Sequence, residues 1–244
     1  LREYAREAAA LDRALAIRPN DLDTRVSRAQ LEVFWKADTR PLHELIESFM
    51  RQNPASGARL APVRIFLATA ERDPTAGLRA VADLGENTYG PDAIRYTRAF
   101  GEGFFAWMKN DTVAAQASFT KARAEQQQIV NAQPDYGPAL CVLGLIDAGL
   151  GRKDDALREG RRAAELMPPS KDSINGAHIM RLLAIIYAWV GEKELTIDQL
   201  QRTAQIPGGL IYGNLRLWPH WDAFRGDPRF EKIGASLAPK DVAK

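Results

Sequence analysis

The sequence predicts an all-α fold in which antiparallel helix hairpins stack into a solenoid, and three observations support this prediction. Helix-forming Ala, Leu, Arg and Glu dominate the 244 residues, and no segment alternates apolar and polar residues as a half-buried strand does. Proline and glycine clusters punctuate the chain about every 15 to 20 residues. Small residues also recur at a fixed spacing across several of the predicted turns.

The first half of the chain is predicted to form five helices bounded by capping residues and prolines. Asp21 can cap the second helix, Pro41 suits the first turn of the third, and Asp73-Pro74 reads as a cap followed by the first helical position. The predicted helices are 1–18, 22–37, 41–53, 56–72 and 74–85. Residues 86–90 are predicted to form a loop.

The second half is predicted to form three hairpins with very short turns. Their helices are expected at 91–109 and 112–131, at 136–150 and 153–167, and at 173–190 and 192–206. Because only one or two residues separate the members of each pair, the two helices must lie antiparallel.

Each of these hairpins carries a pair of small residues twelve positions apart, one on each helix. The pairs are Gly103 with Ala115, Gly144 with Ala156, and Ala184 with Thr196. Glycine within a helix costs about 1 kcal/mol relative to alanine. We therefore expect these residues at the helix crossings, where close backbone approach offsets that cost.

The best hairpin resembles the tetratricopeptide repeat (TPR) family, whose pattern is W-x2-L-G-x2-Y, then A-x3-F, then P. The matching positions are Leu143, Gly144, Ala156, Ala163 and Pro168. Leu140, Asp147 and Gly160 replace the family's Trp, Tyr and Phe, and the repeats are 41 and 40 residues apart instead of about 34. The resemblance implies a right-handed solenoid over 1–206, with its best repeats at 96–134, 137–168 and 177–207 and a degenerate part at 1–95.

The segment 207–244 departs from the repeat pattern and is interpreted as a C-terminal cap. It concentrates aromatic residues, and Asp227-Pro228 predicts a short helix over 228–237. Its Trp-Asp and Arg-Gly-Asp-Pro-Arg-Phe sequences resemble the endings of bacterial TPR proteins. The aromatic residues are expected to cover the last hairpin. A ligand site around His220 is the alternative.

The resemblance also implies a concave groove lined by the first helices of the repeats. The candidate partner-binding residues are Phe100, Phe104, Trp107, Met108, Leu145, Arg181, Ile185 and Trp189. Phe100, Phe104 and Trp107 follow a single helical stripe. Two alternatives stay open for this stripe, since it could be hairpin core or could be covered by the C-terminal segment. The Lys and Asn residues of the family's peptide-carboxylate clamp are replaced by mostly apolar residues, so that function is not carried over.

Composition and motifs narrow the function. With 33 Lys and Arg against 31 Asp and Glu, and no basic block, nothing indicates a nucleic acid or an anionic membrane as a partner. The single cysteine, Cys141, excludes a disulfide within the chain. No P-loop, dinucleotide-binding or zinc-binding pattern is present, and no membrane span is expected. We predict no catalytic, cofactor-binding or metal-binding residues.

The expected function is therefore that of a protein-interaction scaffold or regulatory module that binds a peptide or helix of an unidentified protein. The alternatives are an all-α enzyme and a small-ligand sensor. The chain begins inside a helical pattern and without Met, so we expect it to be part of a longer protein whose other domain could be catalytic. The lack of a signal peptide favours the cytoplasm. A homodimer stays open.

Overall fold

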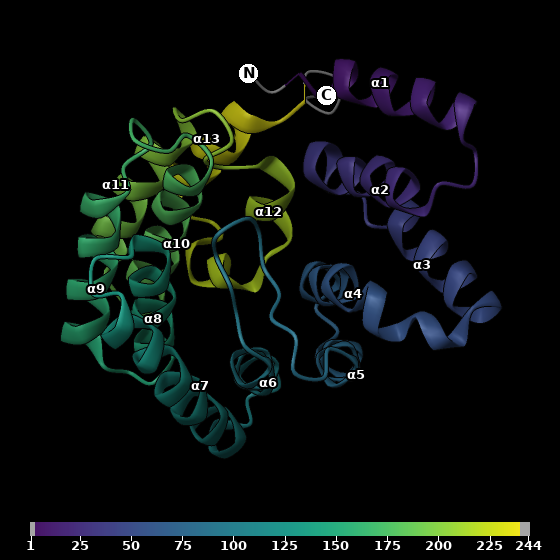
Figure 1. The fold of residues 1–244 in the computed structure, drawn as a ribbon. Helices are drawn as coiled ribbons and strands as arrows, with labels where there is room; N and C mark the ends of the chain where they lie inside the picture. Colours follow the sequence, from purple (N-terminus) through teal and green to yellow (C-terminus); the bar gives the residue numbers. More distant parts are fainter. Residues whose placement is uncertain (1–2, 240–244) are drawn as a thin grey trace.

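A computed structural model of the chain describes residues 3–239 and confirms the predicted all-α solenoid. The first half contains α1 (Tyr4–Ile17), α2 (Leu22–Lys36), α3 (Arg40–Gln52), the 3₁₀ helix η1 (Pro54–Ser56), α4 (Gly57–Glu71) and α5 (Pro74–Asp83). The hairpins of the second half are α6 (Arg98–Met108) with α7 (Thr112–Ala132), α8 (Gly137–Gly149) with α9 (Lys153–Leu166), and α10 (Asn175–Trp189) with α11 (Lys193–Ala204). The helices follow one another around an open C (Figure 1).

The C-terminal segment turns back into the middle of this C. It contains α12 (Tyr212–Leu217), the 3₁₀ helix η2 (Pro219–Phe224) and α13 (Pro228–Leu237). The sequence predicted only the last of these three helices. α12 packs on α2 and α4, η2 packs on α10, and α13 packs on α11. The segment therefore joins the two arms of the solenoid, as the yellow ribbon in Figure 1 shows.

Most helix starts lie where the sequence predicts them, because capping is local. The side chain of Asp21 accepts a hydrogen bond from the Thr24 amide at the start of α2. Asp73 accepts two backbone amides at the start of α5, where Pro74 occupies the first helical position.

The start of α6 corrects the sequence prediction. A helix was expected from residue 91, but residues 91–97 are not helical and α6 begins at Arg98. The backbones of Tyr89 and Tyr96 pair with each other at N–O distances of 3.0 and 2.7 Å. Asp92 has a left-handed φ of 48°, and His178 Nε2 lies 3.1 Å from its Oδ2. These contacts satisfy the loop without a helix and bind it to α10.

The glycine at the crossing of α8 and α9 confirms the role predicted for Gly144, whereas a Cβ on Gly103 would meet the ring of Phe119 at 2.8 Å and not its predicted partner Ala115. A Cβ on Gly144 would lie 3.1 Å from the Ala156 carbonyl oxygen and 3.0 Å from the Gly160 nitrogen. Ala156 is fully buried. The backbones approach so closely that a larger residue would force them apart.

The hydrophobic core extends into the C-terminal segment. Leu215, Trp221 and Phe230 are almost fully buried and belong to the same cluster as the residues of the three C-terminal hairpins. A Cβ on Gly213 would overlap the carbonyl of Val33, so α12 and α2 are in backbone contact. A smaller cluster joins α2, α3 and α4.

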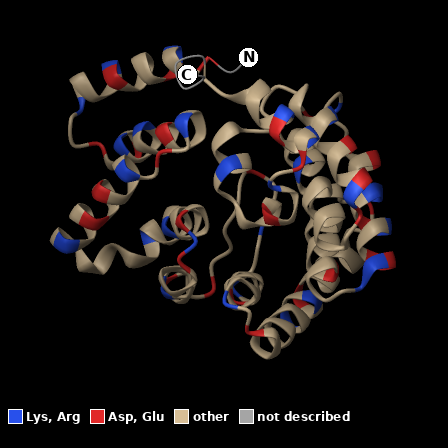
Figure 2. Ribbon diagram, turned by 180° about the vertical axis from the view of Figure 1, so that it is seen from behind, with Lys and Arg blue, Asp and Glu red and all other residues tan. Residues whose placement is uncertain are grey.

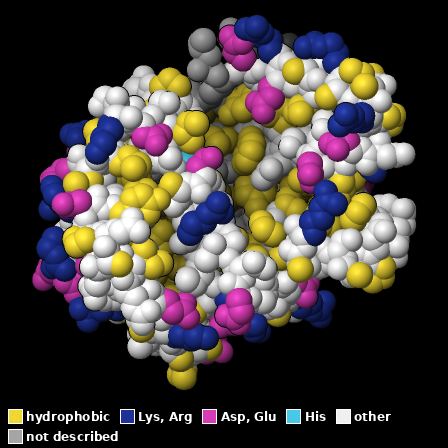
Figure 3. Space-filling model, viewed as in Figure 1, with side chains coloured by type: hydrophobic (Ala, Val, Ile, Leu, Met, Phe, Trp, Pro, Cys, Tyr) yellow, Lys and Arg dark blue, Asp and Glu magenta, His cyan; other side chains and the backbone are white. Residues whose placement is uncertain are grey.

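Basic and acidic residues are mixed over the described ribbon, and neither kind forms a continuous block there (Figure 2). Hydrophobic side chains gather along the hollow between the two arms on the face seen in Figure 3. Within residues 3–239, no helix has the length and the hydropathy needed to cross a membrane.

Candidate functional site

The structure brings the eight predicted groove residues together but buries five of them. Phe100, Phe104, Leu145, Arg181 and Ile185 are each at most 5% exposed. Trp107 is 37% exposed, whereas Met108 and Trp189 are partly buried. The predicted surface is therefore reduced to three residues at the ends of α6 and α10.

The coverage comes from two segments that are distant in sequence. From the loop before α6, the ring of Tyr96 stacks on Phe100 at 4.6 Å. From the C-terminal segment, His220 stacks on Phe104 at 5.2 Å, and the ring of Trp218 lies 5.9 Å from the Arg181 guanidinium. The chain itself thus fills much of its inner surface, which was one of the two alternatives for the stripe.

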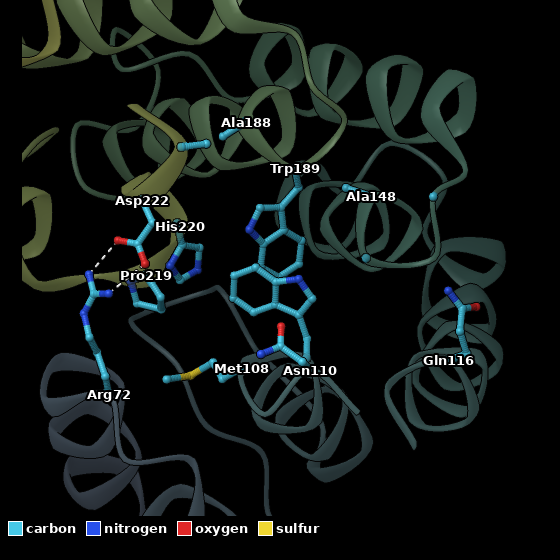
Figure 4. Close-up of a pocket in the computed structure, with 14 residues that line it drawn as sticks. Arg72, Met108, Asn110, Gln116, Ala148, Ala188, Trp189, Pro219, His220 and Asp222 are labelled. Carbon is cyan, nitrogen blue, oxygen red and sulfur yellow. Dashed lines mark hydrogen bonds and ion pairs between the residues drawn. The ribbon is translucent and has the colours of Figure 1, made fainter. Parts of the chain in front are cut away.

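What stays accessible is a cleft of about 680 Å³. The C-terminal ends of α6, α8 and α10 form one side, and η2 and the residue after α4 form the other (Figure 4). The lining residues are Arg72, Trp107, Met108, Asn110, Gln116, Ala148, Gly149, Gly151, Ala188, Trp189, Pro219, His220, Asp222 and Ala223.

Aromatic rings form the centre of this cleft. The Trp107 and Trp189 rings are 5.1 Å apart, and the ring of His220 stacks on Trp189 at 5.4 Å with an interplanar angle of 12°. Trp189 and His220 point toward one another from α10 and η2 (Figure 4). Burial lowers the pKa of His220 to about 3, so its imidazole is neutral at physiological pH and packs as an aromatic ring.

An ion pair crosses one edge of the cleft. Arg72 donates two hydrogen bonds to Asp222 at 2.7 and 2.6 Å (Figure 4). Arg225 donates a third at 2.9 Å. Burial opposes the charge on Asp222, but these hydrogen bonds outweigh that effect and hold its pKa below the usual range. Sequence reasoning missed this pair, because no local pattern joins residues 150 positions apart.

The titratable side chains of the described cleft lining are Arg72, His220 and Asp222. Its described lining contains no serine, threonine, cysteine or lysine that could serve as a nucleophile. With a pKa of about 3, His220 is a weak general base near neutral pH. Among residues 3–239, no three His, Cys, Asp or Glu side chains are grouped as metal ligands would be.

A second polar cluster lies between α7, α8 and α9. Asp147 is fully buried, accepts a hydrogen bond from Arg123 Nε at 2.6 Å and forms an ion pair with Arg152, whose Nε lies 2.9 Å from its Oδ1. Glu159 is 7% exposed, and its burial and the neighbouring Asp147 charge raise its pKa to about 8. This buried carboxyl pair is expected to affect stability, since it lies away from the cleft lining.

Comparisons with known proteins find similar chains among solved structures. Neither a protein-family model nor a curated protein matches the chain. Among solved structures, it is similar to the crystal structure of PilW, described as a widely conserved type IV pilus biogenesis factor. The sequences are 15% identical, the TM-score is 0.47, and the alignment covers 95% of this chain and 90% of that chain.

Proposed function

We propose that this chain is a protein-interaction module that binds a short extended segment of a partner protein in the cleft. The half-exposed indole of Trp107, at the centre of the cleft, is the observation that carries the proposal. Tryptophan is enriched among the side chains that contribute most to binding, and the rim of an interface is typically polar. Here Arg72, Asp222 and Asn110 supply polar groups in the lining.

The covered inner surface limits the size of the ligand. Tyr96, His220 and Trp218 occupy positions over α6 and α10 that a helix lying along the groove would need. The remaining volume of about 680 Å³ lies within the range of small-ligand pockets and suits a few side chains. An extended peptide that inserts one or two side chains therefore fits better than a whole helix.

The same geometry bears on the small-ligand alternative. A small-ligand sensor could enclose its ligand between the rings of Trp107 and Trp189. Their ring centroids are 5.1 Å apart, so the two rings contact each other and would have to separate before a molecule could lie between them. A peptide side chain can bind beside the pair without that rearrangement.

The test combines protein capture with site-specific cross-linking. Trp107→Glu places a charge in the cleft, whereas the control Ile129→Glu alters a residue of similar exposure, 41%, about 20 Å along α7 from the lining residue Gln116. We expect wild type and the control to capture the same protein and Trp107→Glu to lose it while remaining helical by circular dichroism.

A photoreactive phenylalanine analogue at Gln116 should then form an adduct with that captured protein. If all three proteins capture the same partners, or if the adduct forms only from positions outside the cleft, the proposal is wrong.

A further inference from the structure

Three helix ends converge on the cleft. Its lining includes Trp107, Met108 and Asn110 at the end of α6, Ala148, Gly149 and Gly151 at the end of α8, and Ala188 and Trp189 at the end of α10. A helix C-terminus carries a partial negative charge of about half a unit, which stabilises cations placed against it. None of these three helices has a basic residue in its last turn that would compensate this charge.

Aromatic faces border the same space. Trp107 and Trp189 lie in the lining, and Trp107 has the larger exposed fraction, 37%. Tryptophan is the side chain whose ring attracts cations most strongly. His220 adds a third ring and no positive charge, because burial lowers its pKa to about 3.

The described lining of the cleft contains no unpaired positive charge that would repel a cation. Arg72 is the only Lys or Arg in the described lining, and Asp222 neutralises it through two hydrogen bonds. Arg225 also reaches Asp222 but is not a lining residue. Lys109, directly after α6, is exposed and lies outside the lining. The side chains of Asn110 and Gln116 add amide oxygens that can accept hydrogen bonds.

We propose that the partner segment places a cationic side chain, arginine or lysine, in this cleft, against the Trp107 ring and the carbonyl ends of α6, α8 and α10. This inference rests on the proposed function and specifies the partner's chemistry. An acidic partner would meet the same helix ends unfavourably. A purely apolar side chain would offer no donor to the amide oxygens of Asn110 and Gln116 in the lining.

A phage-displayed library of random peptides tests this proposal. Peptides are selected on the wild-type chain and counter-selected on Trp107→Leu, which removes the aromatic face but keeps an apolar residue. We expect the retained peptides to be enriched in Arg or Lys at one position. Replacing that residue by its neutral analogue, citrulline or norleucine, should weaken binding about 5- to 30-fold, the range expected for a cation–π contact of 1–2 kcal/mol.

Each outcome decides between the two proposals. If Trp107-dependent peptides are selected without enrichment of basic residues, or if the neutral analogue binds equally well, the cationic inference falls and the proposed function stands. If no selected peptide depends on Trp107, both fall. Trp107→Phe should retain binding of the basic peptides, since it keeps an aromatic face. Trp35→Leu, on α2, is the control for general effects of losing an indole and should also retain binding. Loss of binding by Trp35→Leu would place the site elsewhere and overturn the inference.

Discussion

Arg72, immediately after α4, and Asp222, in η2, form a two-point ion pair that fastens the C-terminal segment to the N-terminal arm at N–O distances of 2.7 and 2.6 Å. Both side chains are nearly half exposed, at 43% and 44%. Exposed ion pairs contribute little to global stability. This pair, however, links two residues that are 150 positions apart in the sequence.

Arg72→Ala is therefore expected to loosen η2 more than it destabilises the fold. The free energy of unfolding should fall by only about 0.5–1 kcal/mol. Amide hydrogen exchange over residues 219–224 should become faster, because the segment opens locally. Arg40→Ala, which breaks an exposed pair with Asp38 only two residues away, is the control and should leave this exchange unchanged. Equal exchange in both variants would contradict the fastening role.

Gly144→Ala should destabilise the protein although alanine is the better helix former. The new Cβ would lie 3.0 Å from the Gly160 nitrogen and 3.1 Å from the Ala156 oxygen, both backbone atoms that cannot move without shifting α9. We expect a loss of about 1–3 kcal/mol in urea unfolding. The control is Gly234→Ala in α13, where the nearest atom is 3.7 Å away and helix propensity should stabilise by about 0.5–1 kcal/mol. A neutral or stabilising Gly144→Ala would disprove the packing argument.

These two variants also show what the sequence could and could not predict. The glycine crossing was predictable because the spacing of small residues lies within one hairpin. Caps such as Asp21 and Asp73 were predictable for the same reason, since each acts on amides two or three residues away. The Arg72–Asp222 pair depends on how the whole chain folds back, which no local pattern encodes.

The difference between local patterns and contacts from distant parts of the chain also explains why the aromatic stripe is only partly exposed. Phe100, Phe104 and Trp107 share one helix face, and no feature of the sequence distinguishes the covered residues from the accessible one. The structure separates them because Tyr96 covers Phe100 and His220 covers Phe104, whereas Trp107 stays accessible. The covering loop was itself mispredicted as helix, since its backbone pairing and its contact with His178 are tertiary.

Glu159→Gln is expected to remove a pH dependence of stability. The folded-state pKa of Glu159 is raised from 4.5 to about 8, so its contribution is fully present below 4.5 and is lost as the pH rises toward 8. Above that pH the variant should be more stable than wild type by about 1–2 kcal/mol, because no charge is buried beside Asp147. Urea unfolding across this range measures the difference. Glu165→Gln, on the exposed side of α9, should retain the wild-type slope.

His220→Phe is expected to remove a pH dependence of the opposite sign. The folded-state pKa of His220 is lowered from 6.5 to about 3 by burial, so only the unfolded chain gains this proton as the pH falls below 6.5. The contribution of His220 is present above 6.5 and is lost progressively toward 3, by about 1–2 kcal/mol before other groups dominate. Phenylalanine keeps the stack on Trp189 and Phe104 without a titrating nitrogen. Its unfolding free energy should therefore fall less steeply than that of wild type between about pH 6.5 and 4.5.

His178→Phe is the control for the decrease in unfolding free energy at acidic pH. His178 lies near the start of α10, where burial and the Arg181 charge lower its pKa but Asp92 opposes the shift. Its removal should change the acid slope less than removal of His220 does. If His220→Phe follows the wild-type curve, the imidazole takes up a proton in the folded state, and the neutral aromatic stack at the centre of the cleft is disproved.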